Sequence, residues 1–169
     1  MTIAAMDFRA RSFATPLGTM IAVIDRGDAL CRLDFEGPNE AGRRVLDGLK
    51  VTWVADCAMA VIRQIDEYFS GRRAAFDLPL NPRGTPFQQR VWAELKRIPF
   101  GATCSYGALA ARLGMPGAAR AVGGANARNP IAVIVPCHRV IGSTGKLTGY
   151  AGGLSLKKQL LQFEANMSA

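Results

Sequence analysis

The sequence predicts an α+β protein, with a small amino-terminal α/β domain over residues 1–82 and a mostly helical domain over residues 83–169. Three observations lead to this prediction. The first half alternates short apolar runs with turn signals, the second half carries helix start and stop signals, and charge is distributed unequally between the halves. The turn-rich segment Asn81-Pro82-Arg83-Gly84 marks the predicted boundary. A hydrophobic content of 49% with 20% charged residues excludes disordered and fibrous classes.

Strand and helix signals follow one another in the first half. Residues 19–24 and 29–35 are apolar runs, and Gly27-Asp28 between them is a hairpin signal. Apolar residues then recur at helical spacing over residues 61–69, and Gly71 lies where such a helix would end. The first half is therefore expected to form a hairpin with a helix after it.

The second half begins with a strong helix start. Thr85 is a suitable N-cap, Pro86 suits the first helical position, and Gln88 completes a capping box. Further on, two short helices over residues 106–113 and 118–125 are separated by a glycine-containing turn, which makes them a helix-turn-helix candidate. Ordinary packing between two helices explains the same pattern equally well.

The last predicted helix runs from Ser155, as its N-cap, to about residue 165, after a glycine-rich loop. No apolar run approaches the about 18 residues that cross a bilayer. The amino terminus carries Asp7, Arg9 and Arg11 where a secretory signal needs an apolar stretch. We expect a protein that does not enter a membrane and is cytoplasmic or, in a nucleated cell, nuclear.

The two halves of the sequence differ in net charge. Up to Gly84 there are 11 basic and 11 acidic residues, whereas the remainder has 10 basic residues against only Glu94 and Glu164, so the net charge of +8 lies entirely in the second half. Such a surface suits a polyanion, most simply nucleic acid. The alternative is that the excess charge only aids solubility.

The cysteine pattern speaks against a metal site. The four cysteines show no CxxC pair, and His138 is the only histidine, so a Cys/His zinc cluster of the usual spacing cannot form. We predict free thiols and neither a metal nor another cofactor. Cys31, Cys57 and Cys104 lie in or beside apolar segments and are expected to be structural.

Cys137 is the candidate nucleophile. It follows the apolar run 131–135 and Pro136, and it precedes His138, so the one side chain that titrates near neutral pH adjoins a thiol. A thiol needs a base or a cation to become a useful thiolate, and His138 with Arg139 offers both. An inert buried thiol remains the alternative, because neighbouring residues on a strand point to opposite faces.

Glu164 strengthens the case for chemistry at His138. On the last helix it falls within the arc of the apolar residues, so its carboxylate should point to the core and need a partner there. His138 is a natural partner, and the imidazole would then activate Cys137 directly or through a water. Alternatively, Glu164 reaches solvent or pairs with Lys157.

Three further polar residues are candidates for a binding role. Tyr106 and Tyr150 can stack on or hydrogen-bond a planar ligand, although core packing is the commoner fate of tyrosine. Asn129 precedes a proline and is expected to fix a turn.

These residues lie within motifs that resemble the O6-alkylguanine-DNA alkyltransferases, also called methylated-DNA–protein-cysteine methyltransferases. The resemblance covers residues 84–164. The matching segments are Thr85-Pro86-Phe87-Gln88, Val91-Trp92, Ile98-Pro99-Phe100-Gly101, Ser105-Tyr106, Ala119-Arg120-Ala121-Val122-Gly123, residues 129–135, Pro136-Cys137-His138-Arg139-Val140 and Tyr150-Ala151-Gly152-Gly153-Leu154. The first half matches only in outline, and the family's fold implies that it is ribonuclease-H-like.

The resemblance implies direct DNA repair: irreversible transfer of the alkyl group from O6-alkylguanine, and also from O4-alkylthymine, to Cys137, once per molecule. The alkylated nucleotide would be flipped out of double-stranded DNA bound through its minor groove by a monomer. Three sets of site residues are implied. The catalytic set is Cys137, His138, Glu164, Tyr106 and Asn129; the DNA-binding set is Arg120, Ala119, Gly123, Arg128 and Ser105; the guanine pocket is Val140, Tyr150, Ala151 and Gly152.

Two departures from the family's pattern affect these expectations. The chain lacks the histidine-containing amino-terminal zinc site of some members, and it has Ala151 where some have a serine whose hydroxyl faces the pocket. Two other functions are alternatives: a DNA binder that recognises lesions without repairing them, against which Cys137 argues, and a cysteine hydrolase, which the charge distribution does not support.

Overall fold

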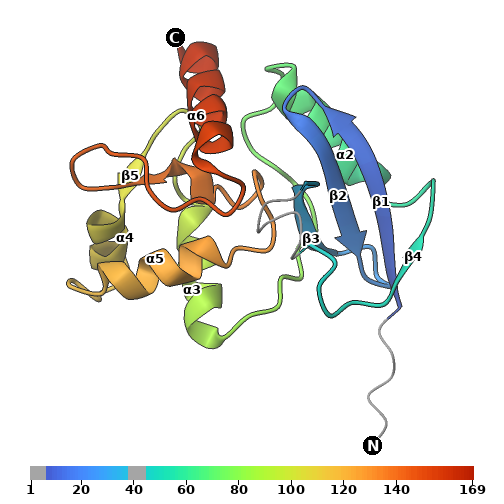
Figure 1. Ribbon diagram of the computed structural model, residues 1–169, viewed down its shortest axis with the longest axis horizontal. Helices are drawn as coiled ribbons and strands as arrows, with labels where there is room; N and C mark the ends of the chain where they lie inside the picture. The colour runs from blue at the N-terminus through green and yellow to red at the C-terminus, as the bar shows by residue number, and fades with distance from the viewer. Residues whose placement is uncertain (1–6, 38–44) are drawn as a thin grey trace, which may run out of the picture. The chain divides into compact units, whose positions relative to one another are not determined.

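The computed structural model describes residues 7–37 and 45–169, and the chain divides into two compact units, Met1–Pro82 and Arg83–Ala169. The first unit contains a four-stranded sheet in the order β3-β2-β1-β4 (Figure 1). Its strands are β1 (Phe8–Thr15), β2 (Gly18–Ile24), β3 (Leu30–Phe35) and β4 (Val51–Trp53). β2 pairs antiparallel with β1 and β3, and β4 lies parallel to β1 at the edge.

The predicted hairpin between β2 and β3 is present. Asp25 organises the connection, because its Oδ1 accepts hydrogen bonds from the backbone N–H groups of Gly27 at 2.9 Å and Ala29 at 3.0 Å. Asp28 adopts a φ of 65°, a conformation that aspartate tolerates in tight turns. β1 and β4 were not among the predicted strands, since β1 interleaves its apolar residues with Arg9 and Arg11 and β4 has only three residues.

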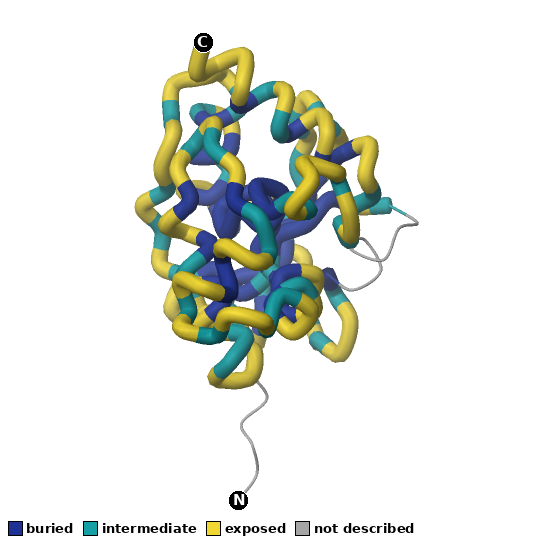
Figure 2. The backbone as a smooth tube through the Cα atoms, turned by 90° about the vertical axis from the view of Figure 1, so that its left-hand side faces the viewer, coloured by how far each residue is buried: buried dark blue, intermediate teal, exposed yellow. Residues whose placement is uncertain are grey.

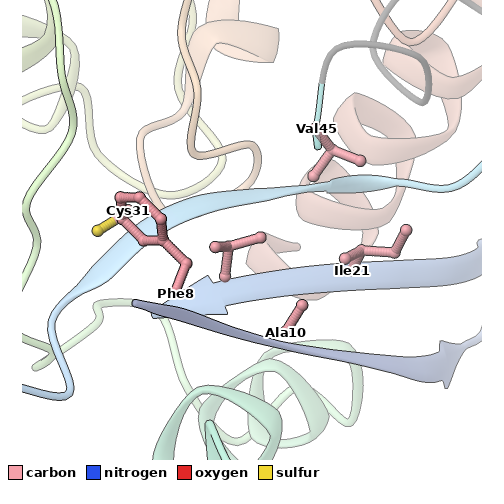
Figure 3. Packing of buried hydrophobic residues seen from close by; sticks show 6 residues of the cluster. Phe8, Ala10, Ile21, Cys31 and Val45 are labelled. Carbon is pink, nitrogen blue, oxygen red and sulfur yellow. The ribbon is translucent and has the colours of Figure 1, made fainter. Parts of the chain in front are cut away.

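Side chains from three strands form the core of this unit on one face of the sheet (Figure 3). Phe8 and Ala10 come from β1, Ile21 from β2 and Cys31 from β3, and Val45 packs against them. The predicted helix is α2 (Met59–Phe69), which contacts β1. Because β2 is buried along both faces, its sequence is a continuous apolar run instead of an alternating one.

The second unit is mostly helical. It contains α3 (Pro86–Leu95), β5 (Cys104–Ser105), α4 (Tyr106–Arg112), α5 (Ala119–Ala127), the 3-10 helix η1 (Cys137–Arg139), β6 (Val140–Ile141) and α6 (Leu154–Ser168). The short strands β5 and β6 pair in parallel. An α/β first unit and a helical second unit confirm the predicted fold class.

Local signals account for the start of α3. Thr85 Oγ1 accepts from the backbone N–H of Gln88 at 3.2 Å, and the Gln88 side chain accepts from the backbone N–H of Thr85 at 3.0 Å, which is the predicted capping box. Trp92 Nε1 then donates to the carbonyl of Ala125 at 2.9 Å and ties α3 to α5. This contact fixes the carboxyl-terminal end of α5, after which the chain continues to Cys137.

The start of α6 differs from the prediction. Gly153 is the N-cap, with a φ of 94°, and Ser155 is already helical, so the expectation that Ser155 caps the helix is wrong. The buried face of α6 includes Lys157 and Glu164. Figure 2 colours the backbone by burial, with buried segments in dark blue among exposed segments in yellow. Among the described residues no helix is long and apolar enough to cross a bilayer.

Candidate active site

The turn that leads from α5 to η1 is organised by Asn129. Its Nδ2 donates to the carbonyls of Ile131 at 3.2 Å and Val135 at 2.7 Å, and its Oδ1 accepts from the backbone N–H of Ile131 at 3.0 Å. Within this turn Val133 has a φ of 69°, which is unusual for a β-branched residue. Asn129 therefore fixes the turn, as its sequence context predicts, and the turn sets the position of Cys137.

Cys137 and His138 lie on the 3-10 helix η1 and not on a strand. Neighbouring side chains on such a helix do not alternate between opposite faces as they do on a strand. Both are buried, with 6% of Cys137 and none of His138 exposed. Asn126, on α5, donates from Nδ2 to the carbonyl of Cys137 at 3.4 Å, which gives the η1 turn a second link to that helix.

Glu164 on α6 points into the core and contacts His138, as predicted. His138 Nε2 lies 2.8 Å from Glu164 Oε1. Arg139 binds the same carboxylate through Nε, at 2.9 Å from Oε2, and through Nη2, at 2.8 Å from Oε1. The backbone N–H of Gly101 adds a hydrogen bond to Oε2 at 3.2 Å. The alternative in which Glu164 pairs with Lys157 is thereby excluded.

The surroundings determine which groups carry charge. Although burial acts to raise the pKa of Glu164, hydrogen bonds from His138 and Arg139 hold it at about 2, so the carboxylate is ionised at neutral pH. Burial lowers the pKa of His138, against the opposing effect of Glu164. The imidazole is therefore neutral at pH 7.

An ionised carboxylate only accepts hydrogen bonds, so a neutral His138 donates to Glu164 from Nε2. The other ring nitrogen, Nδ1, then carries a lone pair. It is buried and has no hydrogen-bond partner within the described part of the chain. Glu164 thus selects the tautomer in which His138 Nδ1 is available as a base.

Tyr106 and Val140 belong to a second cluster beside η1. The hydroxyl of Tyr106 donates to the carbonyl of Thr148 at 3.2 Å, and burial raises the pKa of Tyr106. Lys157 Nζ donates to the same carbonyl at 3.0 Å and to the carbonyl of Val140 at 2.5 Å. The Val140 carbonyl, expected to line the guanine pocket, is therefore already bonded to a lysine.

The segment expected to line the guanine pocket is closely packed at one glycine. A Cβ at Gly152 would lie 2.9 Å from both Leu156 Cδ2 and Tyr150 Cε1, so a side chain at this position would require one or both of these side chains to move. Tyr150, Ala151 and Gly152 are all partly exposed. These residues directly precede α6, whose buried face carries Lys157 and Glu164.

The residues expected to bind DNA cluster on α5 and its ends. Arg120 lies exposed on the first turn of α5 and Arg128 lies exposed at its C-cap, while Ala119 and Gly123 are partly exposed. Ser105 instead uses its hydroxyl to cap α4, accepting from the backbone N–H of Ala108 at 3.0 Å.

Sequence reasoning missed two site residues, Arg139 as the partner of Glu164 and Lys157 as a buried cation. A signal for Lys157 was present, because it precedes Glu164 by seven residues and two helical turns bring such residues to the same face. Within the described residues, no group of three or more histidine, cysteine, aspartate or glutamate side chains is placed to hold a metal ion.

Fold and site together define a protein with a buried thiol next to a hydrogen-bonded histidine–glutamate pair, in the same unit as two short helices. Two sequence models match the chain: "6-O-methylguanine DNA methyltransferase, ribonuclease-like domain" over residues 9–82 and "6-O-methylguanine DNA methyltransferase, DNA binding domain" over residues 86–166. The chain belongs to the 6-O-methylguanine DNA methyltransferase family, as its motifs predict.

Relatives of known name support this assignment. A methylated-DNA–protein-cysteine methyltransferase of Mycobacterium tuberculosis is 59% identical over 103 residues, which cover 61% of this chain and 62% of that relative. A protein of the same name from Mycobacterium leprae is 45% identical over 91% of this chain and 90% of its own length. A crystal structure of Mycobacterium tuberculosis OGT in complex with DNA has a TM-score of 0.84 and 43% identity, covering 95% of this chain and 94% of that one.

Proposed function

We propose that the protein repairs DNA directly, by moving the alkyl group of O6-alkylguanine irreversibly to Cys137. The observation that carries the proposal is the Glu164–His138 pair, which leaves an unprotonated, buried Nδ1 on the residue next to a buried thiol. The similarity to methylated-DNA–protein-cysteine methyltransferases supports this chemistry. O4-alkylthymine presents the same alkyl–oxygen bond on a planar base and is a second substrate of the proposal.

In the proposed reaction His138 Nδ1 takes the thiol proton, directly or through a water, and Glu164 holds the imidazole through Nε2. The thiolate sulfur attacks the alkyl carbon, the bond from that carbon to O6 breaks, and its electron pair remains on guanine. Tyr106 supplies a hydrogen bond or proton to the departing base. The thioether that forms on Cys137 is stable, so each molecule reacts once.

Access to Cys137 supports base flipping. The thiol is only 6% exposed, so an alkyl group on a base stacked within a duplex cannot reach it. In our proposal α4 and α5 act as a helix-turn-helix, and α5 enters the minor groove. The exposed Arg120 on its first turn then fills the space that the flipped nucleotide leaves.

Mass spectrometry after mixing the protein with a duplex that contains one O6-methylguanine tests the proposal. We expect one added methyl group per protein, on the peptide that contains Cys137, with no further uptake from excess DNA. Cys137→Ser should take up nothing while binding the duplex with similar affinity.

Cys104→Ser is the matched control, because Cys104 is a second buried thiol of the same unit and its loss should leave transfer intact. Methylation of the Cys137→Ser protein would contradict the assignment of the nucleophile. Tight binding of the duplex by the unmutated protein without any mass change would favour a lesion binder that performs no repair.

A further inference from the structure

Asn126, on α5, has a buried side-chain amide of which only the nitrogen is hydrogen-bonded. The residue is 2% exposed, and its Nδ2 donates to the carbonyl of Cys137 at 3.4 Å. Its Oδ1 is buried and has no hydrogen-bond partner among the described residues. A buried carbonyl oxygen without a donor is costly to keep, so we expect a donor from a bound molecule to reach it.

Asn129 shows the bonding of an asparagine whose role is structural. Both ends of its amide are used, Nδ2 by two carbonyls and Oδ1 by the backbone N–H of Ile131. The backbone N–H of Asn129 also donates to the carbonyl of Asn126 at 3.2 Å, which fixes the last turn of α5. The amide of Asn126 is therefore held beside the nucleophile through its nitrogen, while its oxygen stays available.

The backbone acceptors around the nucleophile already have donors. The carbonyl of Cys137 accepts from Asn126 Nδ2 and from the backbone N–H of Val140. The carbonyl of Thr148 accepts from a tyrosine hydroxyl and from Lys157 Nζ, and the same Nζ donates to the carbonyl of Val140. A carbonyl oxygen has two lone pairs, so those of Cys137 and Thr148 are both saturated. The side-chain oxygen of Asn126, in contrast, has no donor in the described part of the chain.

The two bases of the proposed reaction differ in whether they can donate to such an oxygen. Once O6 of guanine carries an alkyl group, N1 has no hydrogen, so the exocyclic 2-amino group is the only N–H donor of the base. O4-alkylthymine has no N–H donor, because its N3 has likewise lost its hydrogen. A buried acceptor in the site therefore distinguishes the two bases, since a site built to bond an N–H group rejects a base that lacks it.

We propose that Asn126 Oδ1 accepts a hydrogen bond from the 2-amino group of the flipped O6-alkylguanine and makes the site selective for guanine over O4-alkylthymine. This role rests on the proposed repair function. The amide binds and orients the base, and no proton is transferred to or from it. Because Nδ2 is bonded to the carbonyl of Cys137, the contact also sets the base in a fixed position relative to the nucleophile. A base without the amino group leaves Oδ1 buried and unpaired.

Removing the amino group from the substrate and the oxygen from the protein tests this contact. The substrates are two duplexes that differ in one base, which is either O6-methylguanine or O6-methylhypoxanthine, the analogue without the 2-amino group. Methyl uptake at Cys137 is followed by peptide mass spectrometry in single-turnover reactions with saturating protein. The ratio of the two rates is compared, because a general disturbance of the site slows both reactions equally.

We expect the original protein to react about tenfold faster with O6-methylguanine, the usual effect of leaving one buried acceptor unpaired. Asn126→Leu keeps the approximate volume without an acceptor and should react with both duplexes at equal rates. Asn126→Asp keeps an acceptor oxygen and should retain the preference, although loss of the Nδ2 bond slows both reactions. A third duplex with O4-methylthymine should gain on O6-methylguanine in Asn126→Leu by the same factor as O6-methylhypoxanthine does.

Trp92→Phe is the matched control. It removes another buried side-chain hydrogen bond at the same end of α5, the one from Nε1 to the carbonyl of Ala125 at 2.9 Å, and leaves the amide of Asn126 in place. Any slowing that it causes should be equal for the two duplexes, so the rate ratio should be that of the original protein.

Equal rates of the original protein with the two duplexes would overturn the proposal without any variant, and this is the result expected if a water always occupies Oδ1. A preference that persists unchanged in Asn126→Leu would also overturn it, because another group would then bind the amino group. Loss of the preference in Trp92→Phe would overturn it as well, since the effect would then come from the position of α5. Absence of methyl uptake from every duplex is a distinct result and would reject the proposed repair function, and this contact with it.

Discussion

Replacing Glu164 by glutamine tests the electrostatic core of the site. The change keeps the size of the side chain and removes its charge, so Arg139 loses its carboxylate partner and His138 loses the ionised acceptor of its Nε2 proton. Glu164 is 1% exposed, so water cannot replace the lost charge. Breaking a buried ion pair in this way typically costs about 3 to 5 kcal/mol.

The shifted pKa of Glu164 gives this loss a pH dependence. In the unfolded chain the carboxyl titrates near its ordinary value of 4.5, and in the folded protein near about 2. The folded-state pKa is depressed, so the stabilisation is fully present above pH 4.5 and is lost as the pH falls towards 2. A shift of this size corresponds to about 3 kcal/mol. Glu164→Gln should therefore be less stable than the original protein by about that amount at pH 7, and by much less at pH 3.

Urea unfolding at pH 7, 5, 4 and 3 measures this difference in stability. Trp92 reports on the second unit, because it is buried, whereas Trp53 in the first unit is already exposed. Glu94→Gln is the control, since its partner Arg97 is exposed and its loss should cost less than about 1 kcal/mol at every pH. A difference between the original protein and Glu164→Gln that is equal at pH 7 and pH 3 would refute the reasoning.

Three further predictions concern single residues. Tyr106→Phe should slow transfer from duplex DNA about 100-fold in single-turnover assays while DNA affinity stays the same, and an unchanged rate would remove the tyrosine from the reaction. Arg120→Ala should slow the reaction with alkylated duplex but not with free O6-benzylguanine; equal slowing of both would argue against a role in base flipping. Asn129→Ala leaves three backbone groups of a buried turn without their partner and should reduce the free energy of unfolding by about 3 kcal/mol, whereas a change below about 1 kcal/mol in denaturant titration would contradict the bonding described.

A structural feature could be predicted from the sequence where the residues that cause it lie close together in the chain. The capping box of Thr85 and Gln88 involves residues three apart, so its pattern appears directly in the sequence and in the structure. The burial of Glu164 follows from the period of one helix. By contrast, α6 begins one residue before Ser155, because Gly153 at a φ of 94° supplies the turn that a side-chain cap was expected to supply.

The residues that sequence reasoning missed depend on tertiary structure. The helical period places Lys157 on the face of Glu164, but a lysine in a helix normally keeps its ammonium group in water. Its burial becomes evident only from its bonds to the carbonyls of Val140 and Thr148. The conformation of η1 likewise depends on bonds from Asn129 to a turn whose residue Val133 adopts a φ that propensities disfavour. Asn129 was expected to fix this turn, but nothing in the sequence indicates the left-handed backbone of Val133.

The bonds of Lys157 also bear on where this scaffold tolerates changes in chain length. One side chain holds Val140 and Thr148, which lie on either side of a loop whose tip, residues 143–146, is exposed. Because both flanks are anchored, extra residues at the tip can bulge into solvent without displacing the anchors. The stretch from Asn129 to Cys137 does not tolerate insertions in the same way. The side chain of Asn129 binds backbone groups two and six residues further along, so an added residue between them would break these hydrogen bonds. Within this part of the protein, a peptide tag or a fluorophore-bearing insertion therefore belongs between Ser143 and Lys146, and the eight-residue step to the nucleophile must keep its length.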